Sequence, residues 1–184
     1  RWALTPEWDV SNVEGSADGR YLAWEVNEDG ISKLTVRDQK RGRMVKLPRL
    51  PRGIIVMPTF SPDGRRLAFF MGAGTRPLEL CVLNLANLNL AKVRNLRKDS
   101  GFKQLTYSLL GGLDPKQMVE PRLIRYKSTD GLRISAWLYK PKNLKQGQRA
   151  PVVVSIHGGP EAQEHPFYGY GLYQYWLSRG IGVL

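Results

Sequence analysis

The segment 152–160 contains residues whose types and spacing could do chemistry. The apolar, β-branched run Val152–Ile156 ends abruptly in His-Gly-Gly-Pro at positions 157–160. A short run of this composition predicts a buried strand. Two glycines directly after it can take backbone angles closed to other residues, and they let a ligand approach the main chain. Backbone N–H groups in such a loop could stabilise the oxyanion that develops during acyl transfer.

The same residues allow plainer interpretations. A Gly-Gly-Pro sequence after a strand is also typical of a simple turn. His157 taken alone could be a packed or hydrogen-bonded histidine rather than a functional one. Glu161, directly after the loop, could contact a ligand bound at the loop or could form a surface salt bridge. Whether the loop is a functional site or a simple turn therefore depends on the strands and helices around it.

The composition fits a folded protein of one or two domains. The chain has 184 residues, of which 42% are hydrophobic, and no apolar run is long enough to span a membrane, so we expect no membrane partner. The first residues, Arg1-Trp2-Ala3, contain neither an initiator methionine nor an apolar signal segment. The last residues, Gly180–Leu184, read as the middle of a strand. Both ends predict a fragment of a longer protein.

Thiol and metal chemistry are not favoured by the residues present. The single cysteine, Cys81, lies in the apolar run 78–83 without a neighbouring His or basic cluster. This context predicts a buried structural thiol rather than a nucleophile. One Cys and two His leave no zinc site of the usual composition. We therefore expect no metal and no cofactor.

The formal net charge of +12 raises the question of a nucleic-acid partner. The basic residues are spread over four segments, mostly beside turns or strand ends: 37–52, 92–103, 122–127 and 140–149. No nucleic-acid-binding motif surrounds them. A solvated basic surface is the preferred interpretation, a phosphate-binding face is the alternative, and we expect no nucleic acid to bind.

The first half of the chain carries an internal repeat. Residues 16–24 and 61–69 are identical at six of nine positions, at an offset of 45 residues. This period fits one four-stranded blade of a β-propeller, and the Asp-Gly pair in each copy predicts a hairpin turn. The predicted strands lie at 10–13, 21–26, 33–37 and 44–47 in the first copy, and at 54–60, 67–71, 79–84 and 91–96 in the second. Two blades cannot close a propeller, so we expect further blades to precede Arg1.

The second half predicts a different architecture, with the boundary near 111–121. Residues 123–127 and 132–139 alternate in polarity around an Asp-Gly turn, which predicts an antiparallel hairpin. After strand 152–156 and the glycine loop, aromatic residues recur at helical spacing over 167–178, and we interpret them as core. Gly180 is a suitable end for this helix, and 181–184 reads as the next strand. Strand, loop, helix and strand form a βαβ unit, which indicates a parallel sheet.

Blade repeats of the Ser-Pro-Asp-Gly-Arg type, followed directly by this unit, resemble the prolyl oligopeptidase family of serine peptidases, in its acylaminoacyl-peptidase and dipeptidyl-aminopeptidase branch. The motifs that carry the resemblance are 119–131, 136–141, 175–180 and above all Val-Ser-Ile-His-Gly-Gly-Pro-Glu at 154–161. The resemblance covers essentially the whole chain. It implies a mixed fold, in which residues 1–110 form the last blades of a β-propeller and residues 111–184 form the N-terminal part of an α/β-hydrolase domain.

The resemblance implies a serine peptidase that hydrolyses short peptides through an acyl-enzyme. By resemblance, the loop supplies the oxyanion N–H from Gly159 first and Gly158 second, while His157 shapes the loop. The catalytic Ser, Asp and His follow in that order in this fold. No serine of the chain lies in a G-x-S-x-G sequence, and His157 and His165 precede any such serine. We therefore expect the triad to lie outside this chain, and the chain alone to be inactive.

Two other functions stay open. A propeller-based binding protein could carry a hydrolase-like domain that lacks the nucleophile. An esterase could use the same loop, although a propeller argues against it. A G-x-S-x-G sequence after position 184, followed by an Asp and a His, would decide between an enzyme and a binding protein.

Overall fold

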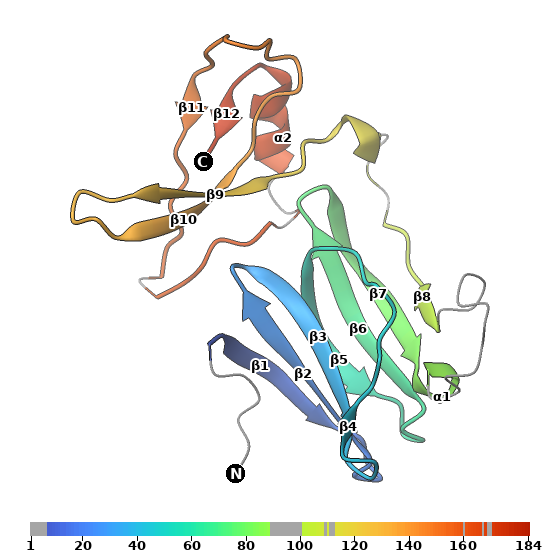
Figure 1. Ribbon diagram of the computed structural model, residues 1–184. Helices are drawn as coiled ribbons and strands as arrows, with labels where there is room; N and C mark the ends of the chain where they lie inside the picture. Colours follow the sequence, from blue (N-terminus) through green and yellow to red (C-terminus); the bar gives the residue numbers. More distant parts are fainter. Residues whose placement is uncertain are drawn as a thin grey trace. The chain divides into compact units, whose positions relative to one another are not determined.

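The structure is a computed structural model that describes residues 7–88, 101–108, 110, 113–159, 161–166, 168 and 171–184 (Figure 1). The chain forms two compact units. The first comprises Arg1–Gly72 and Leu78–Ser108, and the second comprises Ala73–Pro77 and Leu109–Leu184. Four-stranded sheets make up the first unit, whereas strand pairs and a helix make up the second.

The first unit consists of two sheets whose strands follow the order of the chain. The first sheet contains β1 (Asp9–Gly15), β2 (Tyr21–Glu28), β3 (Ile31–Asp38) and β4 (Arg43–Met44), and its neighbours are antiparallel. The second contains β5 (Ile54–Phe60), β6 (Arg66–Ala73), β7 (Arg76–Asn84) and β8 (Phe102–Gln104), with the short helix α1 (Leu85–Leu88) after β7. A four-stranded meander is the form of a propeller blade.

The fourth strand of the second sheet was not predicted from the sequence. The predicted strand 91–96 lies outside the described residues. The fourth strand of the sheet is instead β8, which pairs with the edge of β7 opposite β6, so that Gln104 faces Cys81 and Phe102 faces Leu83. Three residues are too few to display the alternation of polar and apolar residues that predicts a strand. The other predicted strands of both sheets are confirmed, although β4 is shorter than expected.

The side chain of Ser16 closes the first Asp-Gly turn by hydrogen-bonding to a residue within the turn and to the first residue of the next strand. Ser16 Oγ donates to Asp18 Oδ1 at 2.6 Å and accepts from the backbone N–H of Tyr21 at 2.8 Å. Gly19 has a φ of +66°, which favours glycine. The bond from Ser16, together with the backbone N–H of Arg20, holds the pKa of Asp18 below its ordinary value.

The second turn repeats the first in every one of these contacts. Ser61 Oγ donates to Asp63 Oδ1 at 2.6 Å and accepts from the backbone N–H of Arg66 at 3.0 Å. Gly64 has a φ of +64°, and the bond from Ser61 likewise lowers the pKa of Asp63. The predicted equivalence of the two Asp-Gly turns is therefore confirmed.

The repeat also includes a β-bulge that the sequence did not reveal. The register shifts within β1 where it pairs with β2, and within β5 where it pairs with β6. Asn12 in β1 has a φ of +50°, and Met57 in β5 has a φ of +55°. A positive φ is uncommon for residues other than glycine, and bulges often contain such a residue. Because the two positions are separated by the repeat offset, the copies share their backbone irregularities as well as their turns.

The core of the first unit is built from alternate residues of its strands and from Leu85, the first residue of α1. Its completely buried side chains, each 0% exposed, are Ala23, Val36, Leu67, Cys81, Leu83 and Leu85. The rings of Phe69 and Phe102 stack with centroids 6.4 Å apart, so β8 contributes to this core. The burial of Cys81 confirms the predicted structural thiol.

A buried carboxylate fastens the segment after β8 to β7. Glu79 is 7% exposed and accepts hydrogen bonds at 2.6 Å from Thr106 Oγ1 and at 2.6 Å from the N–H of Ser108. Thr106 Oγ1 also accepts from the N–H of Leu80 at 2.8 Å. Burial raises the pKa of Glu79, but the hydrogen bonds outweigh this effect, so the pKa lies below its ordinary value.

The second unit contains the predicted hairpin and the predicted parallel strand pair. β9 (Arg122–Lys127) and β10 (Arg133–Leu138) are antiparallel, and a 3₁₀ turn at Pro115–Gln117 precedes them. β11 (Val152–Val153) and β12 (Gly182–Val183) are parallel, and α2 (Gly171–Ser178) lies between them in the chain. The strand–loop–helix–strand arrangement predicted from the sequence is confirmed.

The strand before the glycine loop is not buried as predicted. β11 has only two residues, and Val152, Val154 and Ile156 are 50%, 62% and 83% exposed. In the described part of the chain, β12 is the one strand paired with β11. A parallel strand becomes buried when both of its faces are covered. The apolar composition predicted the strand, but the cover it needs is not supplied by the described residues.

Helix α2 differs in part from the predicted helix 167–178. Residues 167, 169 and 170 lie outside the described residues, and α2 begins at Gly171. Tyr173 and Leu177 are buried, as expected for core residues four positions apart. Tyr175 is 55% exposed, so its interpretation as a core residue is wrong, because it lies two positions from each buried residue. Among the described helices, none combines the length and apolarity needed to cross a membrane.

Candidate functional site

The glycine loop leaves the sheet at a defined point. The N–H of Gly182 donates to Pro151 O at 2.8 Å, and the N–H of Leu184 donates to Val153 O at 2.9 Å. The N–H of Ser155 donates back to Leu184 O at 2.7 Å. The backbone is therefore held beside β12 as far as Ser155, and the predicted site residues begin two positions later.

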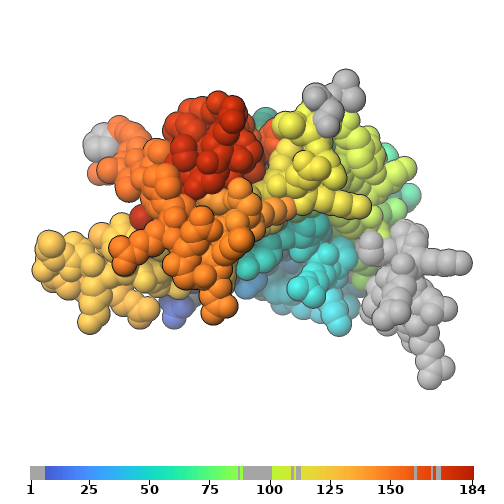
Figure 2. Space-filling model, turned by 90° about the horizontal axis from the view of Figure 1, so that it is seen from above, coloured from blue at the N-terminus to red at the C-terminus, as the bar shows by residue number. Residues whose placement is uncertain are grey.

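The loop offers backbone donors to a ligand. Within residues that the structure describes, no acceptor lies against the N–H of Gly158 or the N–H of Gly159. His157, Gly158 and Gly159 are all exposed. In the space-filling view, the orange segment that contains β11 reaches the molecular surface (Figure 2). Exposed, unused N–H groups of this kind can bind an oxyanion.

The two glycines differ in whether a larger residue could replace them. Gly159 has a φ of +138°, and a Cβ there would lie 3.1 Å from Ala162 Cβ and 3.2 Å from the N of Glu161. A Cβ on Gly158 would meet nothing within 4 Å. The conformation of the loop therefore depends on glycine at 159 and tolerates a side chain at 158.

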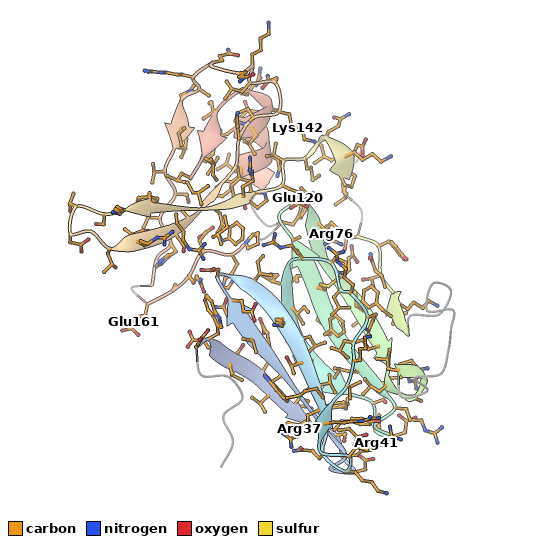
Figure 3. All side chains as sticks on the ribbon, in the orientation of Figure 1. Arg37, Arg41, Arg76, Glu120, Lys142 and Glu161 are labelled. Atoms are coloured by element: carbon orange, nitrogen blue, oxygen red, sulfur yellow. The ribbon has the colours of Figure 1, made fainter. Side chains whose placement is uncertain are left out.

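The polar side chains of the loop, on His157 and Glu161, make few contacts. His157 Nδ1 lies 3.1 Å from the carbonyl oxygen of Gly158, and because that oxygen only accepts, Nδ1 donates in this bond. Glu161 is exposed, and Figure 3 shows its side chain extending outward from the loop. Glu161 has no ion-pair partner among the described residues. Both side chains thus remain accessible at the loop.

Helix α2 contacts the strand end from which the loop departs. Tyr173 is 7% exposed, and its hydroxyl donates to Ser155 Oγ at 2.5 Å. Its ring meets Tyr139 edge to face, with centroids 5.5 Å apart, and stacks on Trp176 at 5.9 Å. The sequence did not predict this contact, because nothing in a helical pattern indicates which hydroxyl a buried tyrosine will reach.

Two further features fix α2. The side chain of Gln174 accepts from the N–H of Val119 at 2.9 Å and donates to Val119 O at 3.1 Å. At the helix end, the N–H of Ile181 donates to Trp176 O at 3.0 Å, and Gly180 has a φ of +79°. This is the Schellman arrangement, which confirms Gly180 as the predicted helix end.

A cavity of about 200 Å³ lies beside the loop in the second unit. Its lining includes His157, Ser155, Tyr173, Tyr139 and Trp137. Over the described ranges, no group of three or more His, Cys, Asp or Glu side chains is placed to hold a metal ion. Besides the residues named above, the cavity lining includes the acidic residue Glu164 and aliphatic residues such as Ile134 and Val154.

Together these features define a protein built mostly of β-sheet, in which two four-stranded sheets are followed by a strand–glycine loop–helix–strand unit that presents backbone donors. No protein-family model matches the chain. The chain is 25% identical over 139 residues to the uncharacterized peptidase YuxL of Bacillus subtilis (strain 168). The matched region covers 74% of this chain and 19% of YuxL.

Two solved structures share the fold. Prolyl oligopeptidase B from Galerina marginata, solved with a 35mer hydrolysis and macrocyclization substrate, matches 96% of this chain with a TM-score of 0.73 and 16% identity. The acylaminoacyl peptidase of Pyrococcus horikoshii matches 96% with a TM-score of 0.66 and 24% identity. The chain covers 23% and 24% of these two chains, so it spans about a quarter of the proteins it resembles.

These neighbours point to the peptidases of the prolyl oligopeptidase family, and they cover most of the chain. The resemblance found in the motifs is thus confirmed. At the level of fold, the chain is mostly β-sheet and matches propeller-type neighbours.

Proposed function

We propose that the whole protein containing this chain is a serine peptidase of the prolyl oligopeptidase family, and that it hydrolyses short peptides through an acyl-enzyme. The peptidases among its relatives support the reaction class. The observation that carries the proposal for this chain is the pair of exposed N–H groups on Gly158 and Gly159, which meet no acceptor among the described residues and lie after a strand of a parallel pair.

In this proposal a serine hydroxyl adds to the carbonyl carbon of the peptide while a histidine takes its proton. The carbonyl oxygen becomes an oxyanion and accepts a hydrogen bond from the N–H of Gly159 or of Gly158. The intermediate collapses, the C–N bond breaks, and the departing amine takes the proton from the histidine. Water then attacks the acyl carbon while the histidine takes a proton from it. The C–O bond to the serine breaks, the serine oxygen takes the proton back from the histidine, and the acid product leaves. The loop does none of the proton transfer.

The domain organisation belongs to the same proposal. Residues 1–110 would be the last blades of a propeller that restricts entry to short peptides, and the two matched four-stranded sheets support this. Residues 111–184 would begin an α/β-hydrolase domain, and the parallel β11–β12 pair across α2 supports this. Glu161 is proposed to meet the amino terminus of the substrate, since its carboxylate is exposed beside the loop.

The test is turnover and labelling of the whole protein. A panel of short chromogenic peptides and a serine-directed phosphonate are applied to it, and to residues 1–184 expressed alone as the matched control. We expect turnover of the peptides, stoichiometric labelling of one serine outside residues 1–184, and no labelling of the control. A whole protein that neither turns over peptides nor reacts would instead be the binding protein. Labelling of a serine within 1–184 would refute the assignment of the triad to other residues.

A further inference from the structure

We propose that Tyr173 is a positioning residue for the oxyanion loop, acting through Ser155. This inference rests on the proposed function, because it assigns a role in the same reaction. The hydroxyl of Tyr173 holds Ser155, which lies two positions before the loop and whose backbone N–H donates to Leu184 O.

The geometry connects the helix to the loop in two steps. Tyr173 donates to Ser155 Oγ at 2.5 Å, while the backbone N–H of the same serine donates to Leu184 O at 2.7 Å. Ser155 is thus held by its side chain from α2 and by its main chain from the end of β12. Ile156 separates Ser155 from His157, the first residue of the loop. Because Gly158 and Gly159 follow only three and four positions after Ser155, a shift of Ser155 would change the direction in which their N–H groups point.

Tyr173 is itself firmly held, as a positioning residue must be. It is 7% exposed, and its ring packs between Tyr139 and Trp176. The next residue, Gln174, makes two hydrogen bonds to the backbone of Val119, which fixes the helix against rotation. The hydroxyl of a ring packed in this way has little freedom to move. Its hydrogen bond therefore restrains Ser155 at the end of the strand.

The neighbouring Tyr175 provides a matched control. It lies on the same helix but is 55% exposed, and its ring packs under the guanidinium of Arg179 at 5.6 Å. Tyr173→Phe and Tyr175→Phe delete the same atom from the same helix. Only the first deletion removes the bond to Ser155.

The experiment measures kcat and KM for a short peptide in the whole protein. Tyr173→Phe is expected to lower kcat about 3- to 10-fold, the effect of one hydrogen bond, with KM changed less than about 2-fold. Ser155→Ala is expected to do the same, and the double variant no more than either single variant, because both remove one interaction. Tyr175→Phe is expected to leave both constants unchanged. An unchanged kcat in folded Tyr173→Phe, or fully additive effects, would overturn the inference.

Hydrogen exchange separates this inference from the proposed function. In Tyr173→Phe the amide of Ser155 is expected to exchange faster than in the wild type, and in Tyr175→Phe at the wild-type rate. If the whole protein hydrolyses no peptide, the proposed function fails, and faster exchange in Tyr173→Phe would still support the positioning of the strand end. Equal exchange in all three proteins would overturn the inference whether or not peptides are hydrolysed. Matching Tm values for the two variants show that the fold is retained.

Discussion

Replacing each loop glycine with alanine gives the sharpest prediction about the site. Gly159→Ala and Gly158→Ala add the same methyl group at adjacent positions and leave every N–H in place. At 159 the methyl carbon would lie 3.1 Å from Ala162 Cβ on a backbone with a φ of +138°. At 158 it would meet nothing within 4 Å. The two variants therefore differ in whether the loop must move.

The magnitude follows from that difference. A residue other than glycine in such a conformation costs on the order of 1–3 kcal/mol, so the loop of Gly159→Ala is expected to rotate and relieve the strain. The rotation turns the N–H of residue 159 away from the oxyanion. Loss of one such donor raises the barrier by about 2.7–4 kcal/mol, or about 10²- to 10³-fold in kcat. Gly158→Ala is expected to change kcat by less than about 3-fold, as an exposed substitution without a clash does.

The assay is steady-state hydrolysis of a chromogenic peptide by the whole protein, with Tm measured for both variants. We expect kcat to fall in Gly159→Ala, KM to change little, and Tm to stay close to that of Gly158→Ala. A folded Gly159→Ala protein with wild-type kcat would refute the role of the loop. Equal losses in both variants would show that the contacts of the added methyl group are not the cause.

Three further predictions concern the stability of the first unit, each measured as the urea midpoint of the whole protein. Leu67→Ala removes a side chain that is 0% exposed and is expected to destabilise the protein by about 2–5 kcal/mol. Leu105→Ala, at a residue that is 45% exposed, should shift the midpoint much less, and equal shifts would contradict the assigned core. Glu79→Gln is expected to lower stability at neutral pH, because a carboxylate with a lowered pKa stabilises above its unfolded pKa and loses that effect as the pH falls through the folded pKa. The difference from wild type should therefore shrink below a pH of about 4.5, the ordinary value, and a pH-independent difference would contradict the role of the charge. Gly64→Ala is expected to destabilise the protein more than Gly19→Ala. Both glycines have a positive φ, but only a Cβ at Gly64 would meet a neighbouring carboxylate, that of Asp18, at 3.3 Å. The reverse order would contradict the turn geometry.

The features that the sequence predicted are those with a local signal. The Asp-Gly turns, the antiparallel hairpin and the parallel pair across α2 each depend on residues close together in the chain. Gly180 was recognisable as a helix end because a left-handed residue after a helix favours glycine. The burial of Cys81 followed from the apolar run around it.

The features that were missed depend on partners distant in the chain. Thr106 lies 27 residues from Glu79, and Ser155 lies 18 residues from Tyr173. Strand β8 is too short to show a pattern, and the exposure of Ile156 reflects the cover available to a strand rather than its own composition. The bulges at Asn12 and Met57 were missed because a bulge is a shift in register between two paired strands, which the sequence of one strand does not display. Asparagine favours a positive φ more than most residues, but methionine does not.

The central claim is that the glycine loop stabilises an oxyanion in a serine peptidase. The most direct measurement is a crystal structure of the whole protein with a phosphonate bound covalently to its nucleophilic serine, since the phosphonyl oxygen occupies the place of the oxyanion. We predict this oxygen at about 2.7–3.1 Å from the backbone nitrogen of Gly159, or failing that of Gly158. A phosphonyl oxygen bound elsewhere, more than about 4 Å from both nitrogens, would contradict the claim.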